Sequence, residues 1–589
     1  MSLQDKKSDF ISFQDISYKI SQNGNLFQKQ SIKKQILSNL TGYFKPGLNA
    51  ILGSSGAGKT TFLNILSKRI EKDNKNELSG DLKINNQDYN ADSFSKFSGY
   101  VMQEDLLLSN LTVKEYITFA ADIRLSLSKE MKHQRINNII KQLKLEHCQN
   151  TIIGDQNSKG ISGGEKKRCC IGIELIAEPQ VLFLDEPTSG LDSFTAYQII
   201  WILKQLSIMK KSIIIFTIHQ PTTDIWQQFD RVLLLIEGQL IYQGLQTNTI
   251  SYFSQMGYQC PKNSNPADYF MSLMSNQDQN IFQKFIENYN KNLLPDHVLQ
   301  IQEQNNQLES SNQKLPQVMI RLPFTSEIGA LLKRQILNLK RHRLLVKTRF
   351  IQVIINGIIT GAIYWQLKRD NQSMQDSLQI AKCLYLLALG IFYQSMNPQV
   401  LAFTQERPVF LKEQSSQMYS IFPYFLSKLI PELFSCSLFA VLMSCIVYWM
   451  IGFAHTAEQF FFFVLTFIIT TNVGNVTGLL AGSIFKSASV SVPFASTFVL
   501  PLFLFGGVFK NRSTYPEWIG WIEYINPSFY SFNALAENEF KNTTFIYNPI
   551  QIYHLNFGKW NSIFMLIVLY FCFALIAYLC LRRHCKKLQ

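Results

Sequence analysis

With 589 residues, the chain is too long for one ordinary domain, and its two halves differ in composition. Residues up to about 320 mix charged and apolar side chains as a soluble domain does, whereas long runs rich in Phe, Leu and Ile follow from about 346. The net charge of +14 comes with no nucleic-acid recognition motif, so a nucleic-acid partner is not expected. The ten cysteines show neither a disulfide framework nor zinc-ligand spacing with histidines, and we expect reduced thiols.

The first segment with a clear pattern, residues 10–20, alternates apolar and polar side chains as an edge strand does. Tyr18 within it either stacks on an adenine base or packs inside the fold. Met1–Phe10 is polar and charged, unlike a cleavable signal peptide. We therefore expect the first half of the chain to stay in the cytosol.

A glycine-rich loop follows a short apolar run at 49–52 and precedes an apolar face at helical spacing. Its spacing fits the phosphate-binding loop, in which backbone N–H groups and a helix N-terminus hold phosphates. Lys59 would reach the β- and γ-phosphates, and the Thr60 hydroxyl would bind Mg²⁺. A glycine-rich turn without a ligand is the alternative. The predicted nucleotide-binding residues are Gly53, Ser54, Ser55, Gly56, Ala57, Gly58, Lys59, Thr60 and Thr61.

Four further motifs follow in a fixed order. They are Gln103 after a strand-like segment, Ser162, Gly163, Gly164 and Glu165 before an apolar helix, Asp185 and Glu186 at the end of an apolar strand, and His219 at the end of another. Taken singly, an acid pair at a strand end is also typical of a capped turn, and a histidine there of a polar loop residue.

Together, these motifs resemble the nucleotide-binding domain of ABC transporters. The resemblance implies ATP and Mg²⁺ as cofactors, with Thr60, Gln103 and Asp185 at the metal. Glu186 would orient or deprotonate the attacking water, His219 would contact the γ-phosphate, and Gln103 would also sense the membrane half. Catalysis of this kind is mostly positioning and charge stabilisation by the catalytic set, Lys59, Gln103, Glu186 and His219.

The resemblance also implies a second chain. In that family geometry, the motif Ser162–Glu165 contacts the γ-phosphate of ATP held by another copy. One phosphate-binding loop and one such motif are present here. Two chains, alike or related, are therefore expected to form two closed ATP sites.

The segment after the ATPase motifs is predicted to be a connector. Residues 276–320 are rich in Gln, Asn, Ser and Lys, a composition typical of a mobile linker. Residues 321–346 then place apolar side chains against a basic face, which predicts an amphipathic helix along the inner membrane surface. An ordinary surface helix of the ATPase is the alternative.

Six apolar runs predict six membrane spans. They lie at about 347–367, 379–403, 422–452, 459–485, 489–510 and 561–581. An even number of spans returns the C-terminus to the cytosol, where the basic residues after the last run belong. The predicted protein is therefore a multi-pass protein of the plasma membrane or a vesicle membrane. Residues 511–560 would form its main external loop, in which Asn526-Pro527 would break a re-entrant helix and Asn511 and Asn542 carry glycosylation sequons.

The order of an ATPase domain before the spans resembles subfamily G, the White, sterol and multidrug half-transporters. Residues 45–48, 265–268, 406–408, 526–527 and 537–540 match that group. The predicted fold is an α/β P-loop ATPase (1–275), the linker (276–320), the connecting helix (321–346) and an all-α six-helix membrane domain (347–589). The implied function is ATP-dependent export of a lipid, sterol or drug-like compound by a dimer. A regulatory or channel-like protein gated by ATP is the alternative.

Polar residues within spans are costly and are candidates for function. Asn356, Asn472, Asn475 and Glu432 are such residues, although the asparagines at 472 and 475 could instead join helices. Phe392 and Tyr393 are predicted to line an apolar cavity between two copies. The resemblance places Val508 and Phe509 at a hydrophobic plug near the outer leaflet.

Overall fold

The computed structural model divides the chain into two compact units. The first comprises residues up to Glu327, Lys412–Met418 and the stretch from Lys586, and the second comprises Ile328–Leu411 and Tyr419–Cys585. The structure describes residues 10–22, 32–70, 76–89, 94, 97–155, 158–275, 279–309, 322–368, 373–485, 487–509, 516–541, 546–555 and 557–588.

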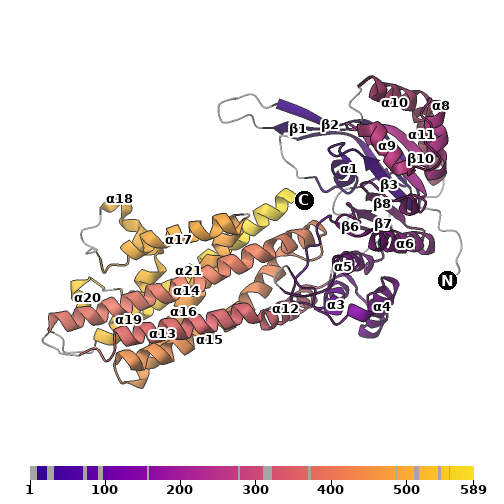
Figure 1. The fold of residues 1–589 in the computed structure, drawn as a ribbon. Helices are drawn as coiled ribbons and strands as arrows, with labels where there is room; N and C mark the ends of the chain where they lie inside the picture. The colour runs from indigo at the N-terminus through magenta and orange to yellow at the C-terminus, as the bar shows by residue number, and fades with distance from the viewer. Residues whose placement is uncertain are drawn as a thin grey trace. The chain divides into compact units, whose positions relative to one another are not determined.

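The first unit contains two sheets (Figure 1). The six-stranded sheet has the order β10-β9-β3-β8-β7-β6, in which only the β10–β9 pair is antiparallel. Its strands are β3 (Gly47–Gly53), β6 (Ser98–Val101), β7 (Val181–Leu184), β8 (Ile213–Thr217), β9 (Arg231–Ile236) and β10 (Gln239–Leu245). The second sheet, β2-β1-β4-β5, contains β1 (Ile11–Gln22), β2 (Ile32–Phe44), β4 (Asn76–Ile84) and β5 (Gln87–Asp88).

The central strands β7 and β8 are apolar and buried at every position, as expected where helices cover both faces of a parallel sheet. Their carboxyl ends, with that of β3, meet at one edge of the sheet, where ligands bind in open α/β folds. The helical elements are α1 (Lys59–Leu66), α3 (Val113–Arg124), α4 (Lys129–Gln142), η1 (Glu146–Cys148), α5 (Gly163–Leu175), α6 (Ser193–Lys210), α7 (Thr223–Trp226), η2 (Gln246–Asn248), α8 (Thr249–Gln255) and α9 (Pro266–Ser275).

Two helices occupy the region that composition predicted to be a mobile linker. They are α10 (Gln279–Asn292) and α11 (Leu294–Glu309), so the expectation of a mobile connector is wrong for 279–309. Both helices are amphipathic: Phe285, Tyr289 and Ile301 are almost fully buried. A few large apolar side chains at helical spacing thus anchor a segment that is polar on average.

The second unit is helical. It contains α12 (Phe324–Arg341, except its first turn), α13 (Arg343–Ile363), α14 (Met374–Ser415, except its last turn), α15 (Ile421–Ile451), α16 (Ala457–Ile484), α17 (Ala488–Leu504), α18 (Glu517–Gly520), η4 (Trp521–Ile525), α19 (Pro527–Phe540), α20 (Pro549–Ile552) and most of α21 (Lys559–Leu588). Helix α15 packs beside both α13 and α16 (Figure 1).

Five helices in the described part of the chain are long and apolar enough to cross a membrane: α13, α14, α15, α16 and α21. The remaining predicted span, at 489–510, corresponds to α17, an apolar helix of 17 residues. Pro493 and Pro501 lie inside α17. Five of the six predicted runs thus form long helices, and the run at 489–510 forms a shorter one.

The predicted amphipathic helix is α12, and nearly all of it belongs to the second unit rather than to the ATPase. Its buried face is partly polar. Asn338 donates a hydrogen bond to Glu406 (3.0 Å), and Arg334 lies over the ring of Tyr419. The apolar Ile336 is exposed. These contacts contradict the alternative of a surface helix on the ATPase.

In the predicted external loop, Asn526-Pro527 lies between two helical segments, because η4 ends at Ile525 and α19 begins at Pro527. The Asn526 side chain accepts a hydrogen bond from the Ser528 N–H, and Pro527 is the first residue of α19. Proline is tolerated at this position because its missing N–H would have no helical partner. The sequons at Asn511 and Asn542 lie outside the described residues.

Candidate nucleotide site and membrane cavity

The predicted phosphate-binding loop connects β3 to α1, as the sequence pattern requires. Gly58 has a φ of 93°, and a Cβ there would lie 2.7 Å from the Leu37 side chain. A Cβ on Gly53 would lie 2.4 Å from the Leu235 carbonyl oxygen. Glycine is therefore required at both positions, by conformation at Gly58 and by close packing at both.

Lys59 lies across this loop. Its Nζ donates hydrogen bonds to the carbonyl oxygens of Gly53 (2.8 Å) and Ser54 (3.0 Å), and only 6% of the residue is exposed. Burial lowers the pKa of Lys59, and the carboxylates of Glu186 and Asp185 act in the opposite direction. The ammonium group is thus held at the loop, where a phosphate would neutralise it.

Asp185 follows β7 and lies beside the first turn of α1. Its Oδ1 accepts hydrogen bonds from Thr60 Oγ1 (3.0 Å) and Thr217 Oγ1 (2.6 Å). The Thr60 hydroxyl and the Asp185 carboxylate are oxygen donors of the kind that Mg²⁺ prefers. These residues therefore fit the implied metal.

Glu186 is fixed by its neighbours on two sides. Its backbone N–H donates to Thr217 Oγ1 (2.8 Å), and its Oε2 accepts from Gln103 Nε2 (2.8 Å). Its φ of 44° is in the left-handed region, which is unusual for a residue other than glycine. The structure thus brings Gln103, which follows β6, and Glu186, which follows β7, together.

Thr217 is a site residue that the motif search missed. It is the last residue of β8, is fully buried, and contacts both acids of the motif through its hydroxyl. The available signal was a single hydroxyl in the otherwise apolar run at 213–218. A buried polar group of this kind needs partners, and here the partners are Asp185 and Glu186.

His219 borders an open cavity of about 1,200 Å³, its mouth included, that is also lined by Ser55, Gln103 and Glu186. Predicted residues from β3, β6, β7 and β8 therefore meet at one opening. The cavity lining does not include Ser162–Glu165.

The motif Ser162–Glu165 caps α5. Ser162 Oγ accepts from the Glu165 N–H (3.3 Å), and Glu165 Oε2 accepts from the Ser162 N–H (2.7 Å) and hydroxyl (2.8 Å). This reciprocal arrangement is a capping box, and it fixes the Ser162 side chain at the N-terminus of α5. Burial raises the pKa of Glu165, but the hydrogen bonds from Ser162 and His147 outweigh it and hold this pKa at about 2.

Tyr18 does not present a free ring for adenine. It is 5% exposed and belongs to the hydrophobic core of the first unit, with Leu37 and Leu82 among its members. Of the two roles considered, the structure supports packing.

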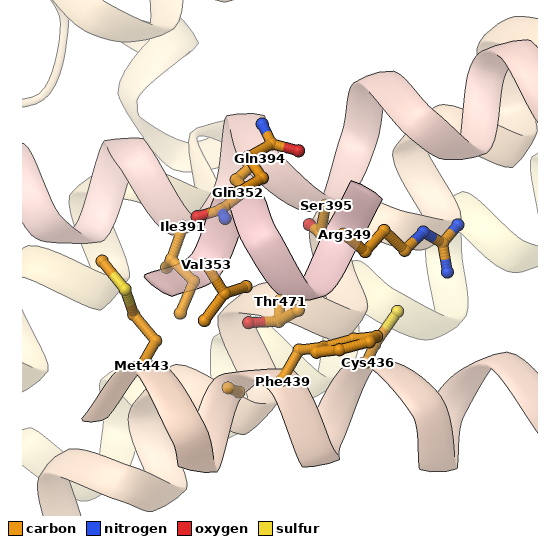
Figure 2. Close-up of a pocket in the computed structure, with 11 residues that line it drawn as sticks. Arg349, Gln352, Val353, Ile391, Gln394, Ser395, Cys436, Phe439, Met443 and Thr471 are labelled. Carbon is orange, nitrogen blue, oxygen red and sulfur yellow. The ribbon is translucent and has the colours of Figure 1, made fainter. Parts of the chain in front are cut away.

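The second unit contains a cavity among α13, α14, α15 and α16, with about 420 Å³ of empty space, its mouth included. Figure 2 shows Val353, Ile391 and Phe439 in its lining, with Met443 at one end and Arg349 and Cys436 toward the other. Gln352, Gln394, Ser395 and Thr471 add polar atoms. The cavity is thus apolar with polar groups on part of its wall.

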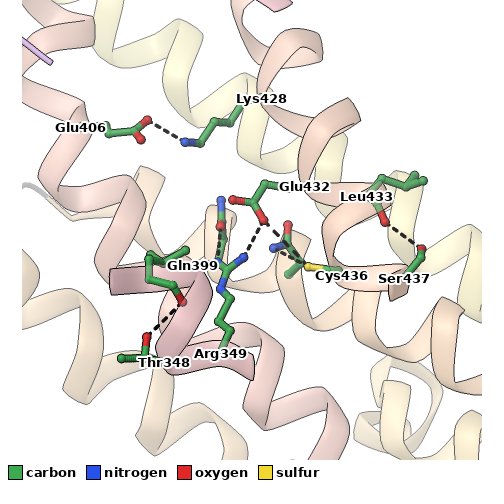
Figure 3. Close-up of polar contacts among 11 residues, drawn as sticks. Thr348, Arg349, Gln399, Glu406, Lys428, Glu432, Leu433, Cys436 and Ser437 are labelled. Carbon is green, nitrogen blue, oxygen red and sulfur yellow. Dashed lines mark hydrogen bonds and ion pairs between the residues drawn. The ribbon is translucent and has the colours of Figure 1, made fainter. Parts of the chain in front are cut away.

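A buried ion pair adjoins this cavity. Arg349 Nη1 lies 2.8 Å from Glu432 Oε2, and Arg349 Nη2 donates to Gln399 Oε1 at 3.4 Å (Figure 3). Glu432 therefore has a structural partner inside its span. Asn472 donates to Ser437 Oγ (3.1 Å) and Asn475 to Cys436 Sγ (3.3 Å), so both asparagines join α16 to α15.

The predicted apolar lining between copies needs one correction. Phe392 is fully buried, and a Cβ on Gly474 of α16 would lie 2.4 Å from its carbonyl oxygen. Phe392 thus packs within its own chain and does not face a cavity between copies. Tyr393 and Phe509 are exposed, at 40% and 58%.

Comparison with known proteins agrees with this architecture. Residues 37–189 match the family model "ABC transporter", and residues 326–540 match "ABC-2 type transporter". A third model, also "ABC-2 type transporter", matches residues 219–295.

Curated relatives match along nearly the whole chain. The broad substrate specificity ATP-binding cassette transporter ABCG2 of Mus musculus is 33% identical over 91% of this chain and 84% of its own length. Protein white of Drosophila melanogaster is 32% identical over 86% and 75%, respectively. ABC transporter G family member 1 of Dictyostelium discoideum is 29% identical over 91% and 78%.

The nucleotide site, the apolar helices and these relatives establish the class of protein. The first unit binds ATP, and the second makes the chain an integral membrane protein. The ATPase is coupled to movement of a substance across the membrane. The chain belongs to subfamily G of the ABC transporters.

Proposed function

We propose that this chain is a half-transporter that exports lipophilic or amphipathic compounds, such as a lipid, sterol or drug-like molecule, as a dimer. The observation that carries the proposal is the arrangement around Glu186, which Gln103 and Thr217 hold at the edge of the cavity that His219 also lines. A protein that used ATP only as a gate would not need this arrangement.

Each residue has a proposed role. Backbone N–H groups of residues 53–61 and the Lys59 ammonium bind the phosphates, and His219 contacts the γ-phosphate. Glu186 orients or deprotonates the attacking water. Thr60, Gln103 and Asp185 would hold Mg²⁺, which when bound neutralises charge on the phosphates. The capped motif Ser162–Glu165 presents its hydroxyl and N–H groups to the ATP of the second chain.

The cavity of the second unit supports an amphipathic cargo. Val353, Ile391, Phe439 and Met443 would contact an apolar body, while the polar lining would contact a headgroup. The description "broad substrate specificity" that the ABCG2 relatives carry agrees with a cavity of this kind. Both termini are proposed to lie in the cytosol, because the ATPase precedes the spans and the basic residues follow the last one.

The test is ATP hydrolysis by the chain in lipid vesicles, with Glu186→Gln as the diagnostic variant. We expect the variant to bind ATP as tightly as the wild type and to lose nearly all turnover, because an amide cannot accept a proton from water. Lys211→Gln, at the C-terminal end of α6 and exposed, is the matched control.

The outcomes separate the two functions considered from the sequence. Turnover that vanishes in Glu186→Gln and rises with an added lipid or drug supports the transporter. Equal hydrolysis by wild type and variant would exclude the assigned role of Glu186. Nucleotide-gated ion flux without hydrolysis would favour the channel-like alternative instead.

A further inference from the structure

Three side chains of metal-binding type converge next to the capped motif. His147 and Cys148 end η1, and Glu165 lies in the first turn of α5. One ligand atom from each residue lies within 4.8 Å of the other two. An imidazole nitrogen, a thiol and a carboxylate oxygen therefore face a common point.

The two oxygens of Glu165 have separate partners. Oε2 accepts the hydrogen bonds from Ser162 that form the capping box, whereas Oε1 lies 2.6 Å from His147 Nε2. A cation could replace the proton between His147 and Oε1 while Oε2 continues to cap the helix. The site can thus be occupied without unfolding the start of α5.

One of the three residues is buried and another is exposed, an arrangement that would hold an ion in place and still let it exchange with solvent. Cys148 is 5% exposed, so its sulfur is held in place, and its thiol also contacts Glu165. The side chain of His147 is 65% exposed and provides a route from solvent. On binding, the thiol would lose its proton to water and supply a thiolate.

We propose that His147, Cys148 and Glu165 form a binding site for Zn²⁺ or a similar transition-metal ion, with water in a fourth position. Cysteine, histidine and carboxylate are the ligands of zinc, and three protein ligands with one open position are typical of sites that exchange a ligand. A sulfur ligand disfavours Mg²⁺ and Ca²⁺, which take oxygen. This site is separate from the Mg²⁺ donors at Thr60 and Asp185.

The sequence pattern did not predict this site. The histidine and cysteine are adjacent, and the third ligand is a glutamate 18 residues from His147 that the motif already assigned to the nucleotide. Only the packing of η1 against the start of α5 brings the three together. Occupation would tie η1 to the helix that carries the Ser162 motif.

The experiment uses the purified full-length chain after metal removal, with excess Mg²⁺ present to occupy oxygen-rich sites. Co²⁺ serves as the spectroscopic probe, because a thiolate ligand gives it a charge-transfer absorption. We expect one equivalent of Co²⁺ per chain to produce this band and Zn²⁺ to abolish it by displacement. His147→Ala should weaken binding at least about tenfold, and Cys148→Ser should remove the band.

Cys260→Ser is the matched control, since Cys260 is a partly exposed thiol whose nearby partners are Ser264 and Pro261. Its spectrum should equal that of the wild type. Absence of the band in the wild type would overturn the proposal. So would a band of unchanged strength and midpoint in His147→Ala. Because the His147 side chain is exposed, weaker binding by this variant is not explained by misfolding.

Discussion

Thr217 shows how a single hydroxyl can organise both acids of the nucleotide site. It donates to Asp185 at 2.6 Å and accepts from the Glu186 N–H at 2.8 Å. Those bonds couple the proposed metal donor to the proposed base. Glu186 also has a left-handed backbone conformation, which persists only when its surroundings hold it.

We expect Thr217→Val to lower the rate of ATP hydrolysis by about 10- to 100-fold, because displacement of a positioned group by even 1 Å can cost that much. Valine keeps the shape of threonine but cannot form either hydrogen bond. Thr217→Ser keeps the hydroxyl and is the matched control, with a rate near that of the wild type. Equal rates for the valine and serine variants would show that the hydroxyl does not position Glu186.

At this scale, sequence predicted the residues whose spacing is set by one loop or one strand end. Gly58, Lys59 and Asp185 belong to such local patterns, and the structure places Lys59 on the loop and Asp185 beside Thr60. Thr217 and the cluster of His147, Cys148 and Glu165 depend on which elements pack together. Spacing along the sequence does not show which distant segments pack together, so these residues could be identified only from the structure.

Helix α11 packs against α10 and β2 through a buried histidine. His297 is 5% exposed, its Nδ1 lies 3.1 Å from the Tyr289 hydroxyl, and its ring contacts Tyr43 edge to face. Burial lowers the pKa of His297 from near 6.5 to about 4, and the positive charge of Arg231 adds to this effect. The folded state therefore keeps the imidazole neutral.

A histidine with a lowered pKa stabilises the fold fully above pH 6.5, and this contribution is lost as pH falls toward 4, because the unfolded chain then binds a proton that the folded chain does not. The largest possible loss is about 3 kcal/mol. We expect hydrogen exchange of residues 294–309, corrected for the intrinsic effect of pH, to increase between pH 7 and pH 5. The increase should be absent in His297→Asn and present in the control His133→Asn, which changes an exposed histidine. A pH-independent protection in the wild type would contradict the prediction.

In the membrane unit, the Arg349–Glu432 pair connects α13 to α15. The two side chains are 9% and 7% exposed, and their charged atoms are 2.8 Å apart. Removal of one partner leaves a buried charge without its counter-ion, which typically costs 3–5 kcal/mol. Two charges replaced together by apolar groups leave no such charge.

We therefore expect Arg349→Met or Glu432→Met alone to lower the thermal unfolding midpoint in detergent strongly, and the double variant to recover most of the loss. Lys559→Met is the control, because its partner Glu458 is 82% exposed and such a pair is worth less than about 1 kcal/mol. Additive losses in the double variant would show that the two residues act independently.

Helices were predicted correctly where an apolar run persisted over about twenty residues. They were missed where the prediction rested on the average composition of a segment. The apolar runs identified α13, α15, α16 and α21, since twenty apolar residues have few other structures available. Helices α10 and α11 were missed because their buried residues are few among Gln and Asn. Position along a helix, rather than mean polarity, decides whether such a segment is ordered.

At the scale of the whole molecule, the arrangement of the ATP site makes a second chain the central question. The cavity at His219 is lined by Ser55 of the phosphate-binding loop and by Gln103 and Glu186, and the capped motif Ser162–Glu165 is not in that lining. Suppose that each site combines the loop of one chain with the motif of another. One substitution in the loop and one in the motif then inactivate one site or both sites, depending on whether two chains or a single chain carry them. This property provides a test of the dimer that does not require knowledge of the cargo.

The test compares two mixed dimers, isolated with two different affinity tags. In the first, one chain carries Lys59→Ala and the other carries Ser162→Arg, so both lesions fall in the same shared site and the other site is intact. In the second, one chain carries both substitutions and the other is wild type, so each site has one lesion. We expect the first dimer to hydrolyse ATP at about half the wild-type rate if the sites act independently, and the second to be nearly inactive.

The reverse ranking would mean that each motif serves the loop of its own chain, because the doubly substituted chain would then leave its partner with an intact site. Dimers that carry Lys59→Ala in both chains provide the background rate. The comparison is insensitive to partial misfolding, since both mixed dimers contain the same two substitutions in the same number. A difference between them can therefore come only from how loop and motif are shared between chains.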